Sequence, residues 1–96
     1  MDRSTAGHYM EDVPGWSLSL DGLKIFRDFE FKNFVEAIAF VNKVADIANQ
    51  EDHHPDISIN YSKVEITLWT HAIGGLSEND FILASKINEI PVELKK

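Results

Sequence analysis

The sequence predicts an α+β domain in which a four-stranded antiparallel sheet carries helices packed on one face. Three observations lead to this fold class: two pairs of alternating apolar segments, a tight turn within each pair, and a helical pattern after each pair. The expected order is therefore β-β-α-β-β-α. A chain of 96 residues is sized for one domain, which we place at residues 10–96.

The first pair of strands follows the turn at Pro14-Gly15. Residues 16–20 alternate between apolar side chains and serine, and Asp21-Gly22 is a typical hairpin turn. Residues 23–31 then place apolar side chains at alternate positions. Phe26 is out of phase with them, which indicates either a two-sided strand or a bulge.

A helix is expected over residues 34–50. Asn33 and Glu36 have the spacing of a capping box, and an apolar stripe begins at Phe34. Pro55 excludes a continuation of the helix through the preceding residue, because a proline forces that residue toward extended geometry.

The second pair of strands covers residues 57–61 and 64–70. Both segments alternate, and so short a connection between them indicates an antiparallel hairpin. Ser77 and Asp80 form a second capping-box pattern, so the last helix is expected over residues 78–89.

Composition narrows the class of protein. Residues 1–9 are polar and aperiodic, so we expect a disordered arm or a cloning remnant there and exclude His8 from the candidate site. Nine basic residues against sixteen acidic ones give a net charge of −7, which argues against nucleic-acid binding. No apolar run approaches the roughly 20 residues of a membrane helix. Because the chain shows no secretory signal and no cysteine, a cytoplasmic location is expected.

Three histidines are the candidate catalytic residues. His53 and His54 precede the third strand, and His71 follows the fourth. Antiparallel pairing brings the start of one strand beside the end of the other, so these imidazoles should meet near Asp52 and Asp56. Imidazole both donates and accepts protons near neutral pH, which favours an acid–base site.

A metal site is the first alternative, with His53, His71 and a nearby aspartate as ligands of zinc or iron. The spacing matches no helical HExxH motif, and the adjacent imidazoles of His53 and His54 are poorly placed to face one ion. We therefore expect no metal at this site.

The segment EDHHPDISINYSKVEITLWTHAIGGLSENDFILASKI resembles the signature of the pterin-4a-carbinolamine dehydratase family. The resemblance consists of HHP, a tyrosine six residues after the proline, V-x-I-T-L-x-T-H, and GLS-x-x-D. Upstream, PGW and F-x-F-K-N-F are similar to the same family. The resemblance extends over about residues 14–90.

The resemblance implies a hydro-lyase, a 4a-hydroxytetrahydrobiopterin dehydratase. Members of the family convert 4a-hydroxytetrahydropterin into quinonoid dihydropterin in tetrahydrobiopterin recycling, downstream of an aromatic amino-acid hydroxylase and without a cofactor. Carried over to this sequence, His53 and His71 are the acid–base groups around the C4a hydroxyl, and His54 positions the pterin ring. Members are dimers or tetramers, so a homodimer or homotetramer is expected.

Four more residues are expected to bind the pterin on the same resemblance: Trp16, Asp52, Pro55 and Asp80. Asp52 would raise an imidazole pKa and fix its tautomer, and Trp16 would pack on the pterin edge or simply belong to the core. Asp80 would orient His71 through a hydrogen bond, beside its structural role as a helix cap.

Two departures from the family pattern leave alternatives open. The residues before PGW are too few for the family's N-terminal helix, which is therefore expected to be missing, and Asn49 stands where animal members have glutamate. The alternatives are a pterin-binding or protein-binding module without turnover, similar to a transcriptional coactivator, and an enzyme for a different pterin.

Overall fold

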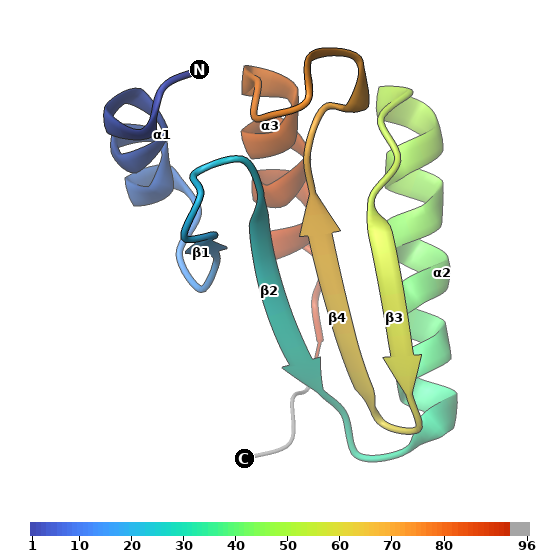
Figure 1. The fold of residues 1–96 in the computed structure, drawn as a ribbon. Coiled ribbons are helices and arrows are strands. Elements are labelled where there is room, and N and C mark those ends of the chain that lie inside the picture. The colour runs from blue at the N-terminus through green and yellow to red at the C-terminus, as the bar shows by residue number, and fades with distance from the viewer. Residues whose placement is uncertain (93–96) are drawn as a thin grey trace.

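The computed structural model describes residues 1–92. Its four strands form one antiparallel sheet in the order β1-β2-β4-β3, with α2 and α3 behind it (Figure 1), which confirms the predicted α+β class. The strands are β1 (Ser17–Leu18), β2 (Ile25–Glu30), β3 (Asp56–Asn60) and β4 (Lys63–Leu68). The helices are α1 (Arg3–Tyr9), α2 (Phe34–Glu51) and α3 (Glu78–Asn88).

The inner strand β4 pairs with β2 on one side and with β3 on the other. Its alternate residues Val64, Ile66 and Leu68 are buried beneath the helices, as the period-2 pattern predicts. The β2–β4 register runs without interruption through Phe26, which pairs with Thr67. Phe26 therefore marks a two-sided strand and not a bulge.

The cap of α2 forms as predicted, because the Asn33 side chain accepts a hydrogen bond from the backbone N–H of Glu36 at 2.9 Å. The buried stripe differs from the prediction. Phe34 is 48% exposed, whereas Ala37 and Phe40 are buried. Further along the helix Val44 and Ala48 are buried, so the stripe was assigned to the wrong residues only at the start of α2.

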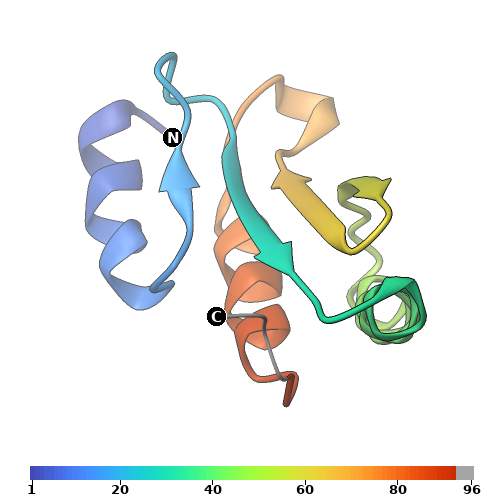
Figure 2. The same cartoon turned by 90° about the horizontal axis from the view of Figure 1, so that it is seen from below.

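Residues 3–9 form a helix and not a disordered arm, which corrects the expectation that an N-terminal helix is missing. The Asp2 side chain caps α1 by accepting a hydrogen bond from Thr5 N at 2.8 Å. Ala6 is fully buried, and the Tyr9 ring stacks on Phe81 of α3 with ring centroids 5.0 Å apart. The helix lies beside β1, at the edge of the sheet (Figure 2). Tertiary contacts therefore stabilise a helix that has no apolar periodicity of its own.

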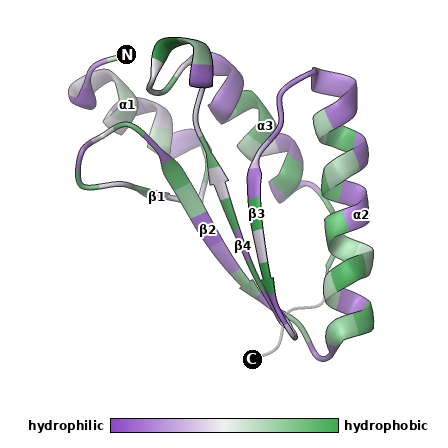
Figure 3. Ribbon diagram, turned by 45° about the vertical axis from the view of Figure 1, so that its right-hand side comes forward, coloured by the Kyte–Doolittle hydropathy of each residue, from purple (hydrophilic) through white to green (hydrophobic). Residues whose placement is uncertain are grey.

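Figure 3 shows where polarity concentrates along the chain. The link from α2 to β3 is hydrophilic, whereas the strands carry hydrophobic stretches. Among residues 1–92, no helix combines the length and the apolar character that a membrane span requires.

Candidate active site

Two loops meet at one end of the sheet and carry the three candidate histidines. Asp56 of β3 pairs with Thr67 of β4, so the residues before β3 and those after β4 emerge side by side. Between them lies a cavity of about 340 Å³. It is lined by Asp52, His53, His54, Trp69, Thr70, His71 and Ala72. The predicted convergence of the three histidines is confirmed, and the volume is within the range of small-molecule sites.

The C-terminal end of α2 positions His53 and His54. Asp52 adopts a left-handed backbone conformation (φ 50°), and the N–H of His53 bonds back to the carbonyl of Ala48 at 3.1 Å. Pro55 then starts the extended segment that enters β3. A short helix ending and a proline thus direct His53 and His54 away from the helix axis.

A closed loop carries His71. Thr70 and Gly75 bridge each other, with Thr70 N bonded to Gly75 O at 2.8 Å. Between them, His71–Ile73 form a single 3₁₀ turn that ends at Gly74, whose φ is +63°. The closed loop therefore holds His71 close to the end of β4, at the sheet end opposite the β3–β4 connection.

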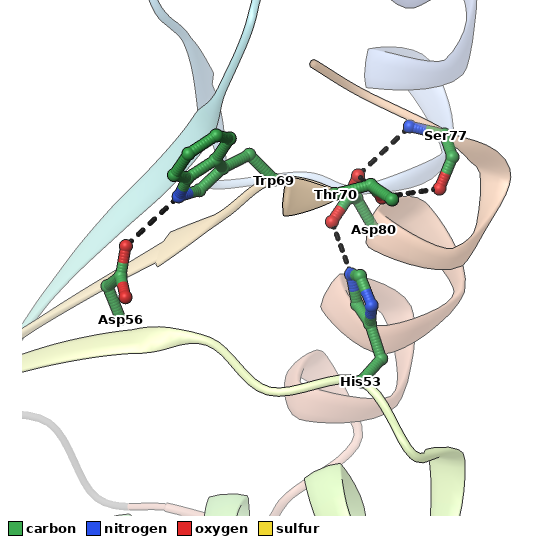
Figure 4. A network of polar contacts seen from close by, with 6 residues as sticks. All are labelled: His53, Asp56, Trp69, Thr70, Ser77 and Asp80. Carbon is green, nitrogen blue, oxygen red and sulfur yellow. Dashed lines mark hydrogen bonds and ion pairs between the residues drawn. The ribbon is translucent and has the colours of Figure 1, made fainter. Parts of the chain in front are cut away.

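Asp80 is the centre of the polar network in Figure 4. It is completely buried. Its Oδ2 accepts hydrogen bonds from the Thr70 hydroxyl and the Ser77 backbone N–H, both at 2.9 Å, and its Oδ1 lies 2.5 Å from His53 Nε2. Asp80 therefore contacts His53 and not His71, which corrects the orienting role expected from the sequence. The capping box with Ser77 forms as predicted.

This contact sets the proton positions on His53. An ionised carboxylate only accepts hydrogen bonds, so His53 donates from Nε2 and carries its proton there. The opposite nitrogen, Nδ1, makes no hydrogen bond within residues 1–92. It is left to accept a proton, and Asp80 then stabilises the resulting imidazolium. Sequence reasoning had given this role to Asp52, whose carboxylate has no hydrogen bond to a histidine among the described residues.

His54 and His71 are held differently. His54 Nε2 lies 3.0 Å from Asn49 Oδ1, so the side chain that replaces the glutamate of animal members contacts the second histidine. The His71 ring stacks on the indole of Trp69, with ring centroids 3.9 Å apart and ring planes 25° apart. The sequence does not indicate this contact, because strand alternation alone gives the face on which Trp69 lies and not its neighbours.

Of the four residues predicted to bind the pterin, only Asp52 lines the cavity; Asp80 is buried beneath it, and Trp16 and Pro55 lie elsewhere. Trp16 is buried in the core, where its indole N–H donates to Asn88 Oδ1 of α3 at 2.9 Å, and it does not line the cavity. Trp16 precedes β1 and belongs to the buried core cluster, which agrees with the core alternative. Pro55 directly follows His54 in the sequence, is half-buried and does not line the cavity. Within the described part of the chain, no three histidine, aspartate or glutamate side chains gather as metal ligands.

Comparison with known proteins decides the family. The family model described as pterin 4 alpha carbinolamine dehydratase matches residues 1–90. The chain belongs to this family. The match includes residues 1–13, which hold α1, so the N-terminal helix lies within the region that the family shares.

Relatives agree with the assignment to the pterin 4 alpha carbinolamine dehydratase family. A protein of Halorhodospira halophila with the same family name is 49% identical over 90 residues, covering 94% of this chain and 83% of its own. Pterin-4-alpha-carbinolamine dehydratase 2, mitochondrial, of Arabidopsis thaliana is 48% identical over 96 residues, and the chain spans about half of its length (51%). The family name denotes a hydro-lyase, so the chain belongs to an enzyme family.

A solved structure supports both the fold and the family. The transcriptional coactivator/pterin dehydratase from Brucella melitensis superposes with a TM-score of 0.84 at 35% sequence identity. The superposition covers 92% of this chain and 94% of the Brucella chain. The arrangement of sheet and helices described above is therefore that of a pterin dehydratase.

Proposed function

We propose that the chain dehydrates 4a-hydroxytetrahydropterin to quinonoid dihydropterin, with His53 and His71 as the acid–base groups and His54 positioning the ring. One observation carries the proposal: three imidazoles line a single cavity, and one of them is paired with the buried carboxylate of Asp80. Family membership supplies the substrate class.

The chemistry needs one proton given and one proton taken. The C4a–O bond breaks and the leaving hydroxide is protonated to water, while the N5–H proton is removed. The N5 electron pair forms the new double bond to C4a, so the net loss is one water. Two imidazoles in opposite protonation states supply both transfers, and each such transfer contributes about 10²–10⁴-fold to a rate.

The Asp80 contact supports a proton-accepting role for His53. Neutral His53 offers Nδ1, and the imidazolium formed there is stabilised by a carboxylate at 2.5 Å. His71 is exposed and lines the same cavity, where it is free to donate to the leaving oxygen. His54 is fixed by Asn49 and is left to hold the pterin.

Four expectations from the sequence are part of this proposal. They are tetrahydrobiopterin as the physiological pterin, supply by an aromatic amino-acid hydroxylase, a homodimer or homotetramer, and a cytoplasmic location. They are supported by the family and by the acidic, cysteine-free composition, and each stays a prediction.

The test follows decay of chemically generated 4a-hydroxytetrahydropterin by stopped-flow absorbance, with and without protein. We expect acceleration by the wild type, loss of at least about 100-fold in kcat for His53→Ala and His71→Ala, and mainly a raised KM for His54→Ala. His8→Ala, on the exposed surface of α1, is the matched control and should behave as wild type. Mild losses in both His53→Ala and His71→Ala would refute the assignment. Pterin binding without acceleration by the wild type would favour the non-catalytic binding module.

A further inference from the structure

We propose that Trp69 is a positioning residue for His71 and that Asp56 fixes the indole of Trp69 in turn. The inference rests on the proposed function, because it concerns how one of the acid–base groups is held. It gives a role to a part of the cavity wall that neither the family motif nor the sequence pattern assigned.

The starting observation is the way His71 is anchored. His53 and His54 each have a side-chain hydrogen bond that fixes the ring, to Asp80 and to Asn49. Within residues 1–92, neither ring nitrogen of His71 has a hydrogen-bond partner, and the residue is exposed on a 3₁₀ turn. Its ring is in contact with the Trp69 indole, at 3.9 Å between centroids. The stack is therefore the main contact that restricts rotation of the His71 ring.

The indole is itself held in place by two side chains: Asp56 at the start of β3, and Lys24, the residue before β2. Its Nε1–H donates to Asp56 Oδ2 at 3.0 Å (Figure 4), and the ammonium of Lys24 lies 4.7 Å from the centre of the indole ring. Asp56 pairs with Thr67, two residues before Trp69, so it reaches the indole as a diagonal cross-strand neighbour. A polar bond at one end and a cation over the ring leave the indole a fixed surface for His71.

This arrangement leaves both nitrogens of His71 available to the cavity. A hydrogen-bonded anchor would occupy one of them, whereas a stacked anchor orients the ring through its face. An imidazole oriented only by stacking can exchange a proton both with a substrate and with solvent. Losing the stack should lower the fraction of time that the ring is in the productive orientation, and so lower kcat.

The expected effects separate positioning from direct pterin binding. If Trp69 orients His71, Trp69→Leu should lower kcat by about 3- to 10-fold, the factor that corresponds to an aromatic pair of ordinary strength, with KM nearly unchanged. Trp69→Phe keeps a ring for stacking and should restore most of the activity. Asp56→Ala should resemble a weaker form of Trp69→Leu, and Asp56→Asn, which keeps an acceptor oxygen, should be close to wild type.

The deciding measurement is independent of activity. In proton NMR spectra, a ring stacked on indole has its carbon-bound protons shifted upfield, and comparison with His71→Ala assigns the signals. We expect the His71 signals to move downfield in Trp69→Leu and to stay near their wild-type positions in Trp69→Phe. Tyr61→Leu, which removes an exposed aromatic ring from the opposite end of the hairpin, is the control and should change neither the signals nor kcat.

Each outcome bears on the inference separately from the proposed function. Unshifted His71 signals in Trp69→Leu, or a raised KM at constant kcat, would overturn the positioning role. Should Trp69→Leu fail to fold, the Asp56→Ala and Asp56→Asn pair tests the same stack. A wild type without dehydratase activity would refute the proposed function, and the NMR comparison would still show whether Trp69 holds the ring.

Discussion

Replacing Asp80 by asparagine is the sharpest test of how the site is built. The side chain keeps its size, but one acceptor oxygen becomes a donor amide. The carboxylate has three donors around it, from His53, Thr70 and Ser77. An asparagine has only one acceptor oxygen, so it can accept either from His53 or from Thr70 and Ser77, but not from both sides. If its oxygen stays with Thr70 and Ser77, its NH₂ faces His53 Nε2, which must then become an acceptor and move the ring proton to Nδ1.

The Asp80→Asn substitution should lower stability moderately and kcat strongly. Loss of one hydrogen bond to a buried charge costs about 1.5–3 kcal/mol. A domain of this size loses about 4–8 °C in Tm per kcal/mol, so Tm should fall by about 8–16 °C for a loss of about 2 kcal/mol. Catalysis should fall more steeply. A proton on Nδ1 blocks the nitrogen that accepts the pterin proton in the proposed mechanism, and removal of one acid–base group lowers kcat by about 10²–10⁴-fold.

Two measurements check the Asp80→Asn variant. Stopped-flow decay of 4a-hydroxytetrahydropterin gives kcat below the melting transition, and nitrogen-15 NMR distinguishes the two tautomers of His53. Asp46→Asn, on the exposed face of α2, is the matched control and should stay within about 0.5 kcal/mol of wild type. A variant that keeps kcat within threefold, or that keeps the His53 proton on Nε2, would show that Asp80 does not set the state of this histidine.

Two further predictions concern the sheet. Ile66→Ala, in the buried centre of β4, should lower the free energy of unfolding by about 2–5 kcal/mol in urea titrations, whereas Val35→Ala, 75% exposed on α2, should change it little. The second concerns pH: the Asp28 carboxyl, hydrogen bonded to Glu65 across the β2–β4 pair, raises the pKa of Glu65. A raised pKa in the folded state means stability is lost as pH rises through it. Glu65→Gln should therefore be more stable than wild type at pH 7, with the difference shrinking toward pH 3.5, and an unchanged difference would contradict this account.

The sheet was predictable because its signals are local. Alternation in β2 and β4 has period 2, and the tight β3–β4 connection leaves one pairing that buries the apolar face. Both N-caps formed at the predicted residues, and at Ser77 the full capping box with Asp80 is present, since a cap depends on spacing over four positions only. The helix α1 has no such signal. It is stabilised by Ala6 and Tyr9 against α3, contacts that exist only once the chain has folded.

The sequence predicted that the three histidines lie together, but not which carboxylate contacts which histidine. Antiparallel register brings His53, His54 and His71 together without any knowledge of side-chain positions. Which carboxylate serves which imidazole depends on rotamers and on the first turn of α3, which the pattern does not specify. Asp80 was thus assigned to the wrong histidine. The sequence left Trp16 either at the pterin edge or in the core, and its burial agrees with the core.

The double role of Asp80 affects how function should be inferred from residues at this site. Its bonds to Ser77 and Thr70 hold the start of α3 and the His71 loop, so a chain that had lost turnover would still need it to fold. Its presence is therefore weak support for catalysis. His71 is exposed, and neither of its ring nitrogens has a hydrogen-bond partner within the described residues, so the fold gains little from keeping it. A histidine at that position, stacked on an indole that Asp56 and Lys24 hold in place, is better explained by proton transfer than by stability. Variants of His71 and Trp69 should accordingly separate activity from folding, which variants of Asp80 cannot do alone.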